Sequence, residues 1–226
     1  FIQLPTTILA AVDSSVGGKT AVDLPEGKNL VGAFYQPELV VCDTDTFQTL
    51  TPEIYADGMA EAIKYGMIWD EELFELFEQK SIDINEICAR CVAIKAKVVG
   101  EDEFDLGLRK ILNFGHTIGH AIEKLSNYQI SHGSAVAIGM VMITRSAEVM
   151  QTGAPGEMTA RLINTLKSYN LPTSCEYEAE AIAALAKSDK KREGAVISAI
   201  LPQRIGEVKI CDMRMDEWNS YVKKGV

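Results

Sequence analysis

The 226-residue sequence has few of the features that mark specialised protein classes. Its longest apolar run, residues 135–143, is too short to cross a bilayer, because a membrane-spanning helix needs about 20 residues. It contains no internal repeat and no low-complexity segment. The net charge of −10 excludes a general affinity for nucleic acid or for anionic membranes, so an anionic ligand would need a local cluster of basic side chains.

The sequence also lacks a regular cysteine pattern. Its five cysteines are an odd number scattered along the chain, which argues against a disulfide framework and indicates reduced thiols in the cytoplasm. Cys88 and Cys91 form a C-x-x-C, but no second pair accompanies them, so we interpret both as core or boundary residues of a helix. The chain begins at Phe1 with no charged-then-apolar leader, and we expect it to be a fragment of a longer protein.

Two kinds of pattern divide the chain. Residues 1–48 are rich in Gly, Pro, Thr and β-branched residues and predict part of an α/β domain, with extended segments at 1–4, 30–35 and 39–42. Residues 49–226 predict a mainly α-helical domain. Its helices are expected at 53–66, 70–79, 83–100, 108–126, 133–151, 156–169, 178–187 and 215–223, with a short β-hairpin formed by 194–201 and 206–210.

Histidine is scarce, yet the three histidines lie close together in the sequence. If residues 108–126 form one helix, four polar side chains fall within roughly 40° of one line: Arg109, Asn113, His116 and His120. A solvated face is the common explanation of a polar stripe, but such faces usually carry Lys, Glu and Gln. Arg, Asn and His instead bind anions, donate directed hydrogen bonds or bind metals, so we predict a binding site here.

The histidine spacing indicates a metal site but not a protease. His116 and His120 have the spacing of a zincin helix, whereas Thr117 occupies the position of the catalytic glutamate in H-E-x-x-H. His132 lies at the predicted start of the next helix, where a tight turn could return it to His116. Two imidazoles and one carboxylate would form a catalytic zinc site with positions left open for a substrate.

Glu61 is a candidate for that carboxylate, although spacing alone cannot select it among 32 acidic residues. Its predicted helix, GMAEAIKYG at 58–66, is otherwise made of apolar or small residues, and Glu61 and Lys64 lie on one face of it. Buried charges need partners, so an internal ion pair between these two residues explains the pattern equally well. The sequence leaves both interpretations open.

Residues 13–20, DSSVGGKT, resemble a phosphate-binding loop only in part. Gly18, Lys19 and Thr20 match the end of the Walker pattern, but Asp13 stands where its first glycine belongs. Consecutive glycines still expose N–H groups that can face an anion, and Lys19 adds a positive charge. The alternatives are an ordinary glycine-rich turn and, less consistent with Asp13, a nucleotide hydrolase.

Four long motifs follow one another in the chain: PTTILAAVDSSVGGKTAVDLPEGKNLVGAFYQP (5–37), GMAEAIKYG (58–66), DEFDLGLRKILNFGHTIGHAIE (102–123) and HGSAVAIGM (132–140). Together they resemble the 3-dehydroquinate synthase family of the sugar-phosphate cyclase superfamily. The resemblance covers the C-terminal two-thirds of such an enzyme and implies that the glycine-rich pyrophosphate site precedes residue 1. Asp23 stands where the family has Asn, and Ser134 where Glu is usual, and we expect both differences to have modest effects.

The resemblance implies a role for many of these residues and for several others. The ligands of a Zn²⁺ or Co²⁺ ion fall on Glu61, His116 and His132. The substrate contacts fall on Asp13, Lys19, Asn29, Lys64, Lys95, Arg109, Asn113, His120 and Lys190, with Lys191 as the alternative to Lys190. The NAD contacts fall on Thr6, Thr7, Lys19, Lys28 and the turn formed by Thr46, Phe47, Gln48 and Thr49. A further arginine, supplied by the neighbouring subunit, would precede residue 1.

The resemblance also implies a reaction. Members of this family are lyases of the shikimate pathway of aromatic amino acid biosynthesis, and convert 3-deoxy-D-arabino-heptulosonate 7-phosphate to 3-dehydroquinate and phosphate, with NAD regenerated in each turnover. We therefore expect a cytoplasmic homodimer that acts on this small phosphorylated sugar acid, with no nucleic acid or membrane partner. We expect the chain alone to be nearly inactive. Another sugar-phosphate cyclase and a non-catalytic metal-binding module stay open as alternatives.

Overall fold

The structure is a computed structural model that describes residues 1–24, 27–81, 83–150, 156–188 and 196–226. Its α-helices are α1 (Pro52–Ile68), α2 (Glu71–Gln79), α3 (Ile84–Glu101), α4 (His116–Leu125), α5 (His132–Val149), α6 (Met158–Ser168), α7 (Ala179–Ser188) and α8 (Met215–Gly225). The predicted mainly helical domain is confirmed. Three shorter helical segments are η1 (Ala10–Ser14), η2 (Thr44–Thr49) and η3 (Leu108–Asn113). Among the described residues, no helix has the length and apolar character that a membrane crossing requires.

The strands of the described residues form three separate two-stranded sheets. β1 (Ile2–Gln3) runs parallel to β4 (Leu39–Val40), and β2 (Lys19–Leu24) runs antiparallel to β3 (Gly27–Phe34). β5 (Ile197–Arg204) and β6 (Glu207–Met213) form the predicted C-terminal hairpin. The prediction missed β2: Lys19 and Thr20 begin a strand, whereas the corresponding residues of a phosphate-binding loop begin a helix.

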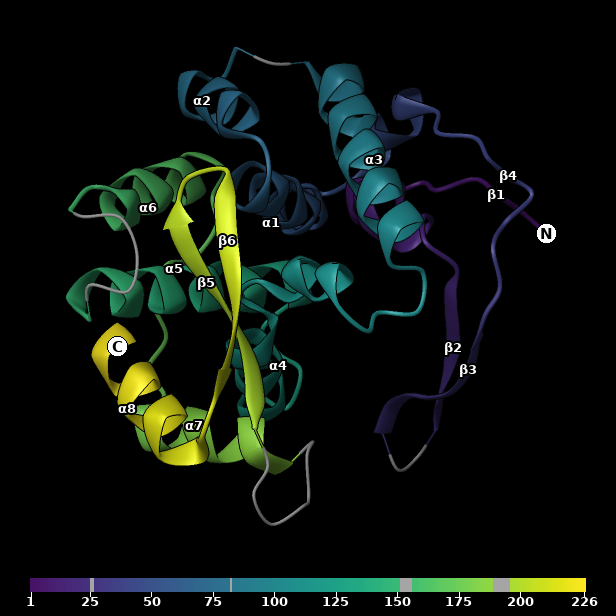
Figure 1. The fold of residues 1–226 in the computed structure, drawn as a ribbon. Helices are drawn as coiled ribbons and strands as arrows, with labels where there is room; N and C mark the ends of the chain where they lie inside the picture. The colour runs from purple at the N-terminus through teal and green to yellow at the C-terminus, as the bar shows by residue number, and fades with distance from the viewer. Residues whose placement is uncertain (25–26, 82, 151–155, 189–195) are drawn as a thin grey trace.

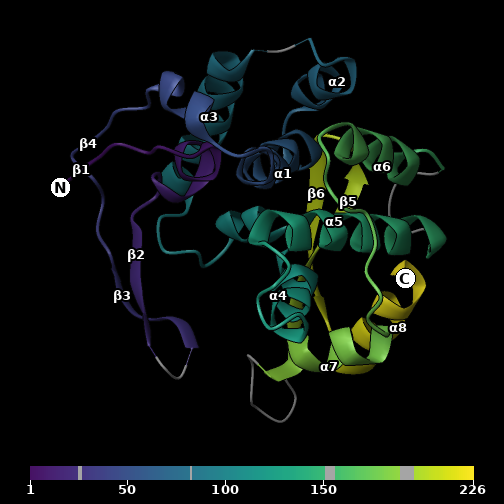
Figure 2. The same ribbon diagram turned by 180° about the vertical axis from the view of Figure 1, so that it is seen from behind.

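Helix α5 forms the centre of the helical body (Figure 1). It packs against α1, α4, α6, α8 and β5. The apolar run at 135–143 is buried on every side, as expected of a helix with no polar face. The β5–β6 hairpin crosses one face of this body, and α7 and α8 lie beside its lower end (Figures 1 and 2). The hairpin contacts both α1 and α5.

The N-terminal strands lie to one side of the helical body (Figures 1 and 2). The segment η1, which lies between β1 and β2, packs against α1 and α3. The approach to α1 is close, because a β-carbon on Gly58 would lie 2.5 Å from the β-carbon of Ile8. This contact places Asp13, within η1, against the helix that carries Glu61.

The predicted single helix over 108–126 was wrong. The 3-10 helix η3 ends at Asn113, and α4 begins at His116 after a reversal at Gly115, whose φ is +78°. Glycine adopts such a left-handed φ without steric cost. A β-carbon at Gly115 would also lie 2.6 Å from Cγ of Met140. Arg109 and Asn113 therefore do not share a helical stripe with His116 and His120. Tertiary packing has to bring these four side chains together.

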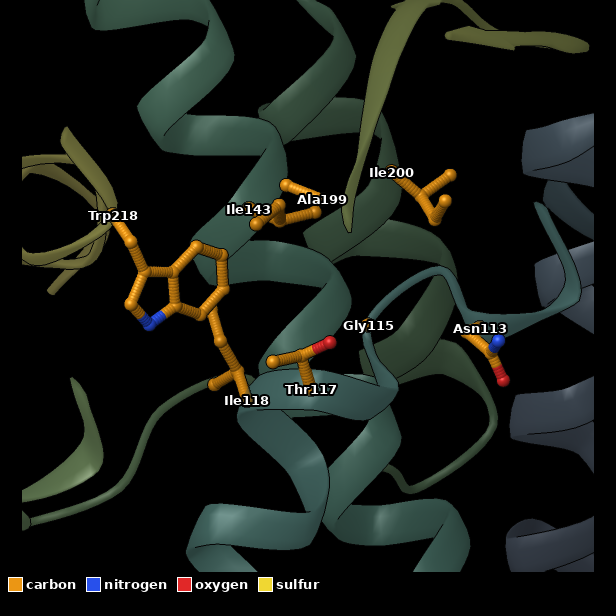
Figure 3. Close-up of a pocket in the computed structure, with 8 residues that line it drawn as sticks. All are labelled: Asn113, Gly115, Thr117, Ile118, Ile143, Ala199, Ile200 and Trp218. Carbon is orange, nitrogen blue, oxygen red and sulfur yellow. The ribbon is translucent and has the colours of Figure 1, made fainter. Parts of the chain in front are cut away.

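Figure 3 shows the packing behind this break. A small internal space separates α4 from β5 and α8, and it is lined by Asn113, Gly115, Thr117, Ile118, Ile143, Ala199, Ile200 and Trp218. Trp218 of α8 is fully buried and reaches Ile118 in the first turn of α4. The side-chain amide of Asn113 points away from Trp218 and Ile118. The C-terminal helix therefore supports the turn of α4 that begins at His116.

Candidate metal centre and its cationic cleft

Three side chains from three helices converge on one point. Glu61 comes from the middle of α1, His116 is the first residue of α4, and His132 is the first residue of α5. Nε2 of His116 lies 3.3 Å from Oε1 of Glu61, and Nε2 of His132 lies 3.4 Å from the same oxygen. The potential ligand atoms of the three residues all lie within 4.8 Å of one another. The expected return of His132 towards His116 is present in the structure.

The first turn of α5 is held directly on α1. The Oδ1 atom of Asp57 accepts hydrogen bonds from the N–H of Ser134 at 3.0 Å and from the hydroxyl of Ser131 at 2.5 Å. Gly133 leaves room for this approach. Because Asp57 lies one helical turn before Glu61, these contacts bring His132 to the carboxylate.

Glu61 is fully buried and uses its two carboxylate oxygens differently. Oε2 accepts a hydrogen bond from Nζ of Lys64, so the internal ion pair considered from the sequence is present. Oε1 has no hydrogen-bond partner among the described residues. Burial raises the pKa of Glu61, but the charges of Lys64 and His116 outweigh it and hold the pKa well below its usual value. An ionised carboxylate oxygen therefore faces the two imidazoles.

The other ring nitrogens of both histidines have partners of their own. Nδ1 of His116 lies 3.1 Å from the carbonyl oxygen of Phe114, and Nδ1 of His132 lies 3.3 Å from Oε2 of Glu123. Burial lowers the pKa of His132, but its contacts with the carboxylates of Glu123 and Glu61 raise that pKa to about 10. Two imidazole Nε2 atoms and one unpartnered carboxylate oxygen form a donor set that suits Zn²⁺ or Co²⁺.

A cleft of about 670 Å³ opens beside this cluster, within the usual size range of small-molecule sites. Every described substrate contact implied by the resemblance lines it: Asp13, Lys19, Asn29, Lys64, Lys95, Arg109, Asn113 and His120. Lys190 and its alternative Lys191 lie outside the described residues. The cleft thus combines residues from η1, the β2–β3 hairpin, α1, α3, η3 and α4.

Lys95 and Asp13 form the inner ion pair of the cleft. Nζ of Lys95 lies 2.5 Å from Oδ1 of Asp13, which also accepts a hydrogen bond from the hydroxyl of Tyr65 at 3.0 Å. Burial raises the pKa of Asp13, but the charges of Lys64 and Lys95 outweigh it and lower the pKa. Burial lowers the pKa of Lys95, and Asp13 opposes that shift only in part.

Arg109 and Lys19 link the two loops at the mouth of the cleft. The buried Arg109 guanidinium donates to the carbonyl oxygens of Glu103 at 2.5 Å and of Gly17 at 2.7 Å. Lys19 forms an ion pair with Asp105. The glycine-rich loop is therefore tied to the loop of residues 102–109 by two cationic side chains. Because a guanidinium carries five N–H donors, Arg109 retains further donors for a ligand.

Among the residues assigned to NAD, Lys19 lines the cleft, whereas the threonines near residue 6 and the 46–49 turn do not. Thr7 accepts a hydrogen bond from the N–H of Ala10, and Thr46 and Thr49 donate to carbonyl oxygens of the same short segment, at Asp43 and Thr46. The side chain of Phe47 is buried in the core, whereas Thr6 and Gln48 are exposed. Lys28 falls on β3, and its side chain lies outside the described part of the structure. Their contact with NAD stays a prediction.

Sequence reasoning did not single out two acidic residues of this region. Asp105 pairs with Lys19 at the mouth of the cleft, and its backbone adopts a positive φ of +61°. Glu123 follows His116 by seven residues and lies on the same face of α4. The spacing of Glu123 was a usable signal, whereas nothing local in the sequence indicates the pairing of Asp105 with a residue 86 positions away.

Comparisons with known proteins identify the family. Residues 1–57 match the family model described as 3-dehydroquinate synthase N-terminal, and residues 58–192 match the model described as 3-dehydroquinate synthase C-terminal. A 3-dehydroquinate synthase of Clostridium perfringens (strain 13 / Type A) is 51% identical over 215 residues, which cover 92% of this chain and 61% of that protein. One of Acaryochloris marina is 44% identical over 225 residues, covering 94% of this chain and 60% of that protein. The chain thus spans about three-fifths of these curated relatives.

Solved structures share the fold. A 2-deoxy-scyllo-inosose synthase complexed with carbaglucose-6-phosphate, NAD⁺ and Co²⁺ matches with a TM-score of 0.84 and 27% identity, over 100% of this chain and 66% of that one. The 2-epi-5-epi-valiolone synthase of Streptomyces hygroscopicus subsp. jinggangensis matches with a TM-score of 0.87 and 22% identity, over 98% of this chain and 64% of that one. At this identity the match shows a shared fold only. By its motifs, its fold and both family models, this chain belongs to the 3-dehydroquinate synthase family.

Proposed function

We propose that the protein is a 3-dehydroquinate synthase, which converts 3-deoxy-D-arabino-heptulosonate 7-phosphate to 3-dehydroquinate and phosphate with catalytic NAD and a divalent metal ion. The observation that carries this proposal is the meeting of Glu61, His116 and His132 beside a cleft with several buried cationic side chains. A substrate with vicinal hydroxyls, a carboxylate and a phosphate requires both features in one cavity.

The metal would be held by Oε1 of Glu61 and by Nε2 of His116 and His132. When bound, the ion supplies Lewis acidity that lowers the pKa of a coordinated hydroxyl, and NAD supplies a hydride acceptor. The chain's own contribution is to orient the substrate and to exclude water around it. Lys64 takes part by fixing the Glu61 carboxylate through its second oxygen.

Two groups of cationic and polar residues suit the two anionic ends of the substrate. We assign the carboxylate to Lys95 and Arg109, which are both buried and belong to neighbouring elements. We assign the phosphate to Lys19, Asn113, His120 and, outside the described residues, Lys190. Because charge-assisted hydrogen bonds strengthen in a cavity of low dielectric constant, such a local cluster lets an acidic protein bind a multiply charged anion.

Binding of two sugar phosphates tests the proposal on this chain. The zinc-loaded chain is titrated by calorimetry with 3-deoxy-D-arabino-heptulosonate 7-phosphate and with a heptulose 7-phosphate that lacks the carboxylate. We expect the carboxylated sugar to bind more tightly, and the preference to fall by roughly 10- to 100-fold in Lys95→Met, since a hydrogen bond to a charged group contributes about 1.5–3 kcal/mol. Lys97→Met, an exposed lysine of the same helix, is the control.

The outcomes separate the alternatives. Equal binding of both sugars would favour another sugar-phosphate cyclase, and zinc binding with no sugar binding would favour a non-catalytic metal-binding module. Release of phosphate in the presence of NAD and zinc, measured with the same samples, reports turnover directly. A melting temperature that rises with ATP but not with the sugar phosphates would favour a nucleotide hydrolase, which already conflicts with the strand that begins at Lys19.

We also propose a domain division at residues 48 and 49, a homodimeric assembly and a cytoplasmic location. The division rests on the change in sequence pattern near residue 48, and the homodimer rests on the resemblance. The location rests on five cysteines that are all free, because free thiols persist in reducing compartments. Sedimentation of the protein at several concentrations measures the assembly.

A further inference from the structure

His132 is oriented by two carboxylates on opposite sides of its ring. Its Nε2 atom faces Oε1 of Glu61 at 3.4 Å, and its Nδ1 atom faces Oε2 of Glu123 at 3.3 Å. An imidazole that binds a metal through Nε2 keeps its proton on Nδ1, where it needs an acceptor. Glu123 is such an acceptor, and the role of Glu123 is not accounted for by the substrate cleft, whose lining does not include it.

An ionised Glu123 carboxylate at this position would destabilise the fold unless another group compensates its charge. Its side chain is only 7% exposed, and burial disfavours an ionised carboxylate. It also lies in the last turn of α4, where the partial negative charge of the helix end disfavours an acid. The contact with the Nδ1 atom of His132 offsets both effects, since a hydrogen bond from the ring stabilises the charge.

The backbone around Glu123 is fixed by the connection between α4 and α5. The carbonyl oxygen of Glu123 accepts hydrogen bonds from the hydroxyl of Ser126 at 2.8 Å and from the N–H of Tyr128 at 2.7 Å. The Ser126 hydroxyl in turn accepts from the N–H of Ile130 at 3.1 Å, just before α5 begins. The carboxylate and the imidazole are therefore held at the two ends of one tied loop.

We propose that Glu123 is a positioning residue of the metal centre: it accepts the Nδ1–H of His132 and so fixes the tautomer and ring orientation in which Nε2 faces the ion. This inference rests on the proposed function, in which Glu61, His116 and His132 hold the metal. His116 has the same arrangement with a neutral acceptor, the carbonyl oxygen of Phe114. The carboxylate makes His132 the more basic ligand of the two.

The test compares Glu123→Gln, which keeps the shape and removes the charge, with Glu123→Asp and Glu123→Ala. Zinc affinity of the whole chain is measured by competition with a chromophoric chelator. We expect roughly 10- to 100-fold weaker binding for Gln and Ala, and a smaller loss for Asp, which retains the charge. Glu72→Gln, at a side chain that is 87% exposed, is the matched control and should bind zinc as the unchanged chain does.

A second readout separates positioning from loss of structure. The ¹⁵N spectrum of the histidine side chains should show His132 protonated on Nδ1 in the zinc-loaded chain, an altered ring signal in Glu123→Gln, whose amide oxygen is a weaker acceptor, and a mixture of tautomers in Glu123→Ala. Melting of each metal-free variant reports folding, and Glu123→Gln is the decisive variant where Glu123→Ala fails to fold. Zinc affinity of Glu123→Gln within twofold of the unchanged chain overturns the inference.

The same titrations distinguish the remaining outcomes. His120, Glu123 and His132 also lie close enough to form a second group of potential ligands. Two zinc equivalents in the unchanged chain, with only the weaker one lost in Glu123→Gln, would make Glu123 a ligand of a second ion and overturn the positioning role. An unchanged chain that binds no zinc would instead contradict the proposed function itself.

Discussion

Gly133 lies so close to Asp57 that a β-carbon on it would come within 2.1 Å of the Asp57 carbonyl oxygen. The first turn of α5 therefore rests on the backbone of α1 with no side chain between them. His132 immediately precedes this contact, and Glu61 follows Asp57 by one helical turn. The meeting of the metal-binding candidates thus depends on a helix crossing that only glycine permits.

Gly133→Ala should separate α5 from α1. We expect the variant to lose about 1–3 kcal/mol of unfolding free energy, as overpacked sites do, and to bind zinc more weakly. Urea denaturation and chelator competition measure the two effects. Gly100→Ala is the control, because Gly100 lies in α3 with nothing within 4 Å of an added β-carbon, and alanine should stabilise that helix by about 0.5–1 kcal/mol. Equal stability and zinc affinity in Gly133→Ala would contradict the close crossing.

Asp57→Ala should loosen the start of α5. The carboxylate accepts hydrogen bonds from Ser131 and Ser134 and acts as the cap of this helix from a neighbouring element. Loss of such a cap costs about 0.5–2 kcal/mol, measurable by urea denaturation. Asp57→Asn keeps an acceptor and should lose less than Asp57→Ala. If the two variants unfold at the same urea concentration as the unchanged chain, the cap contributes nothing.

Asp102→Asn should show a pH-dependent effect. The Asp102 carboxylate accepts hydrogen bonds from the N–H groups of Leu106, Gly107 and Arg109, and those bonds lower its pKa below the ordinary value of 3.8. Since the folded-state pKa is the lower one, the stabilisation is complete above about pH 5 and disappears as pH falls through the folded-state pKa.

The measurement is the difference in unfolding free energy between the unchanged chain and Asp102→Asn. We expect a constant difference between pH 5 and pH 7 and a progressive loss of the difference below pH 4. Glu72→Gln, with its exposed side chain, should show little difference at any pH. A difference for Asp102→Asn that grows on acidification would be inconsistent with the loop contacts.

Cys88 should react slowly with alkylating reagents in the folded protein. Burial raises its pKa to about 12, with a further contribution from the neighbouring Cys42 thiol, and only the thiolate reacts. Cys42 is exposed, so iodoacetamide at pH 8 should label it well before Cys88. Peptide mass spectrometry over time gives the order in which the two cysteines are alkylated. In urea, where the chain is unfolded, both should react at similar rates. Labelling of Cys88 at the rate of Cys42 in the folded chain would be the contrary result.

The sequence by itself determined most of the helices, because their signals are local. The apolar run at 135–143 has no polar face, which is typical of a buried helix, and it forms the middle of α5. The C-terminal hairpin and the core positions of Cys88 and Cys91 follow from similar local patterns. The long motifs also indicated the family, since many residues in a fixed order carry more information than any single spacing.

Only the tertiary structure decided how the site is assembled. The break at Gly115 depends on the approach of Met140, a contact that periodicity within 108–126 cannot contain. Residue spacing could not select Glu61 among the acidic residues, and it could not show that one of its oxygens pairs with Lys64 while the other faces two imidazoles. Such meetings depend on helix crossings between segments that are far apart in the chain, whereas the sequence pattern of a helix records only which of its faces is buried.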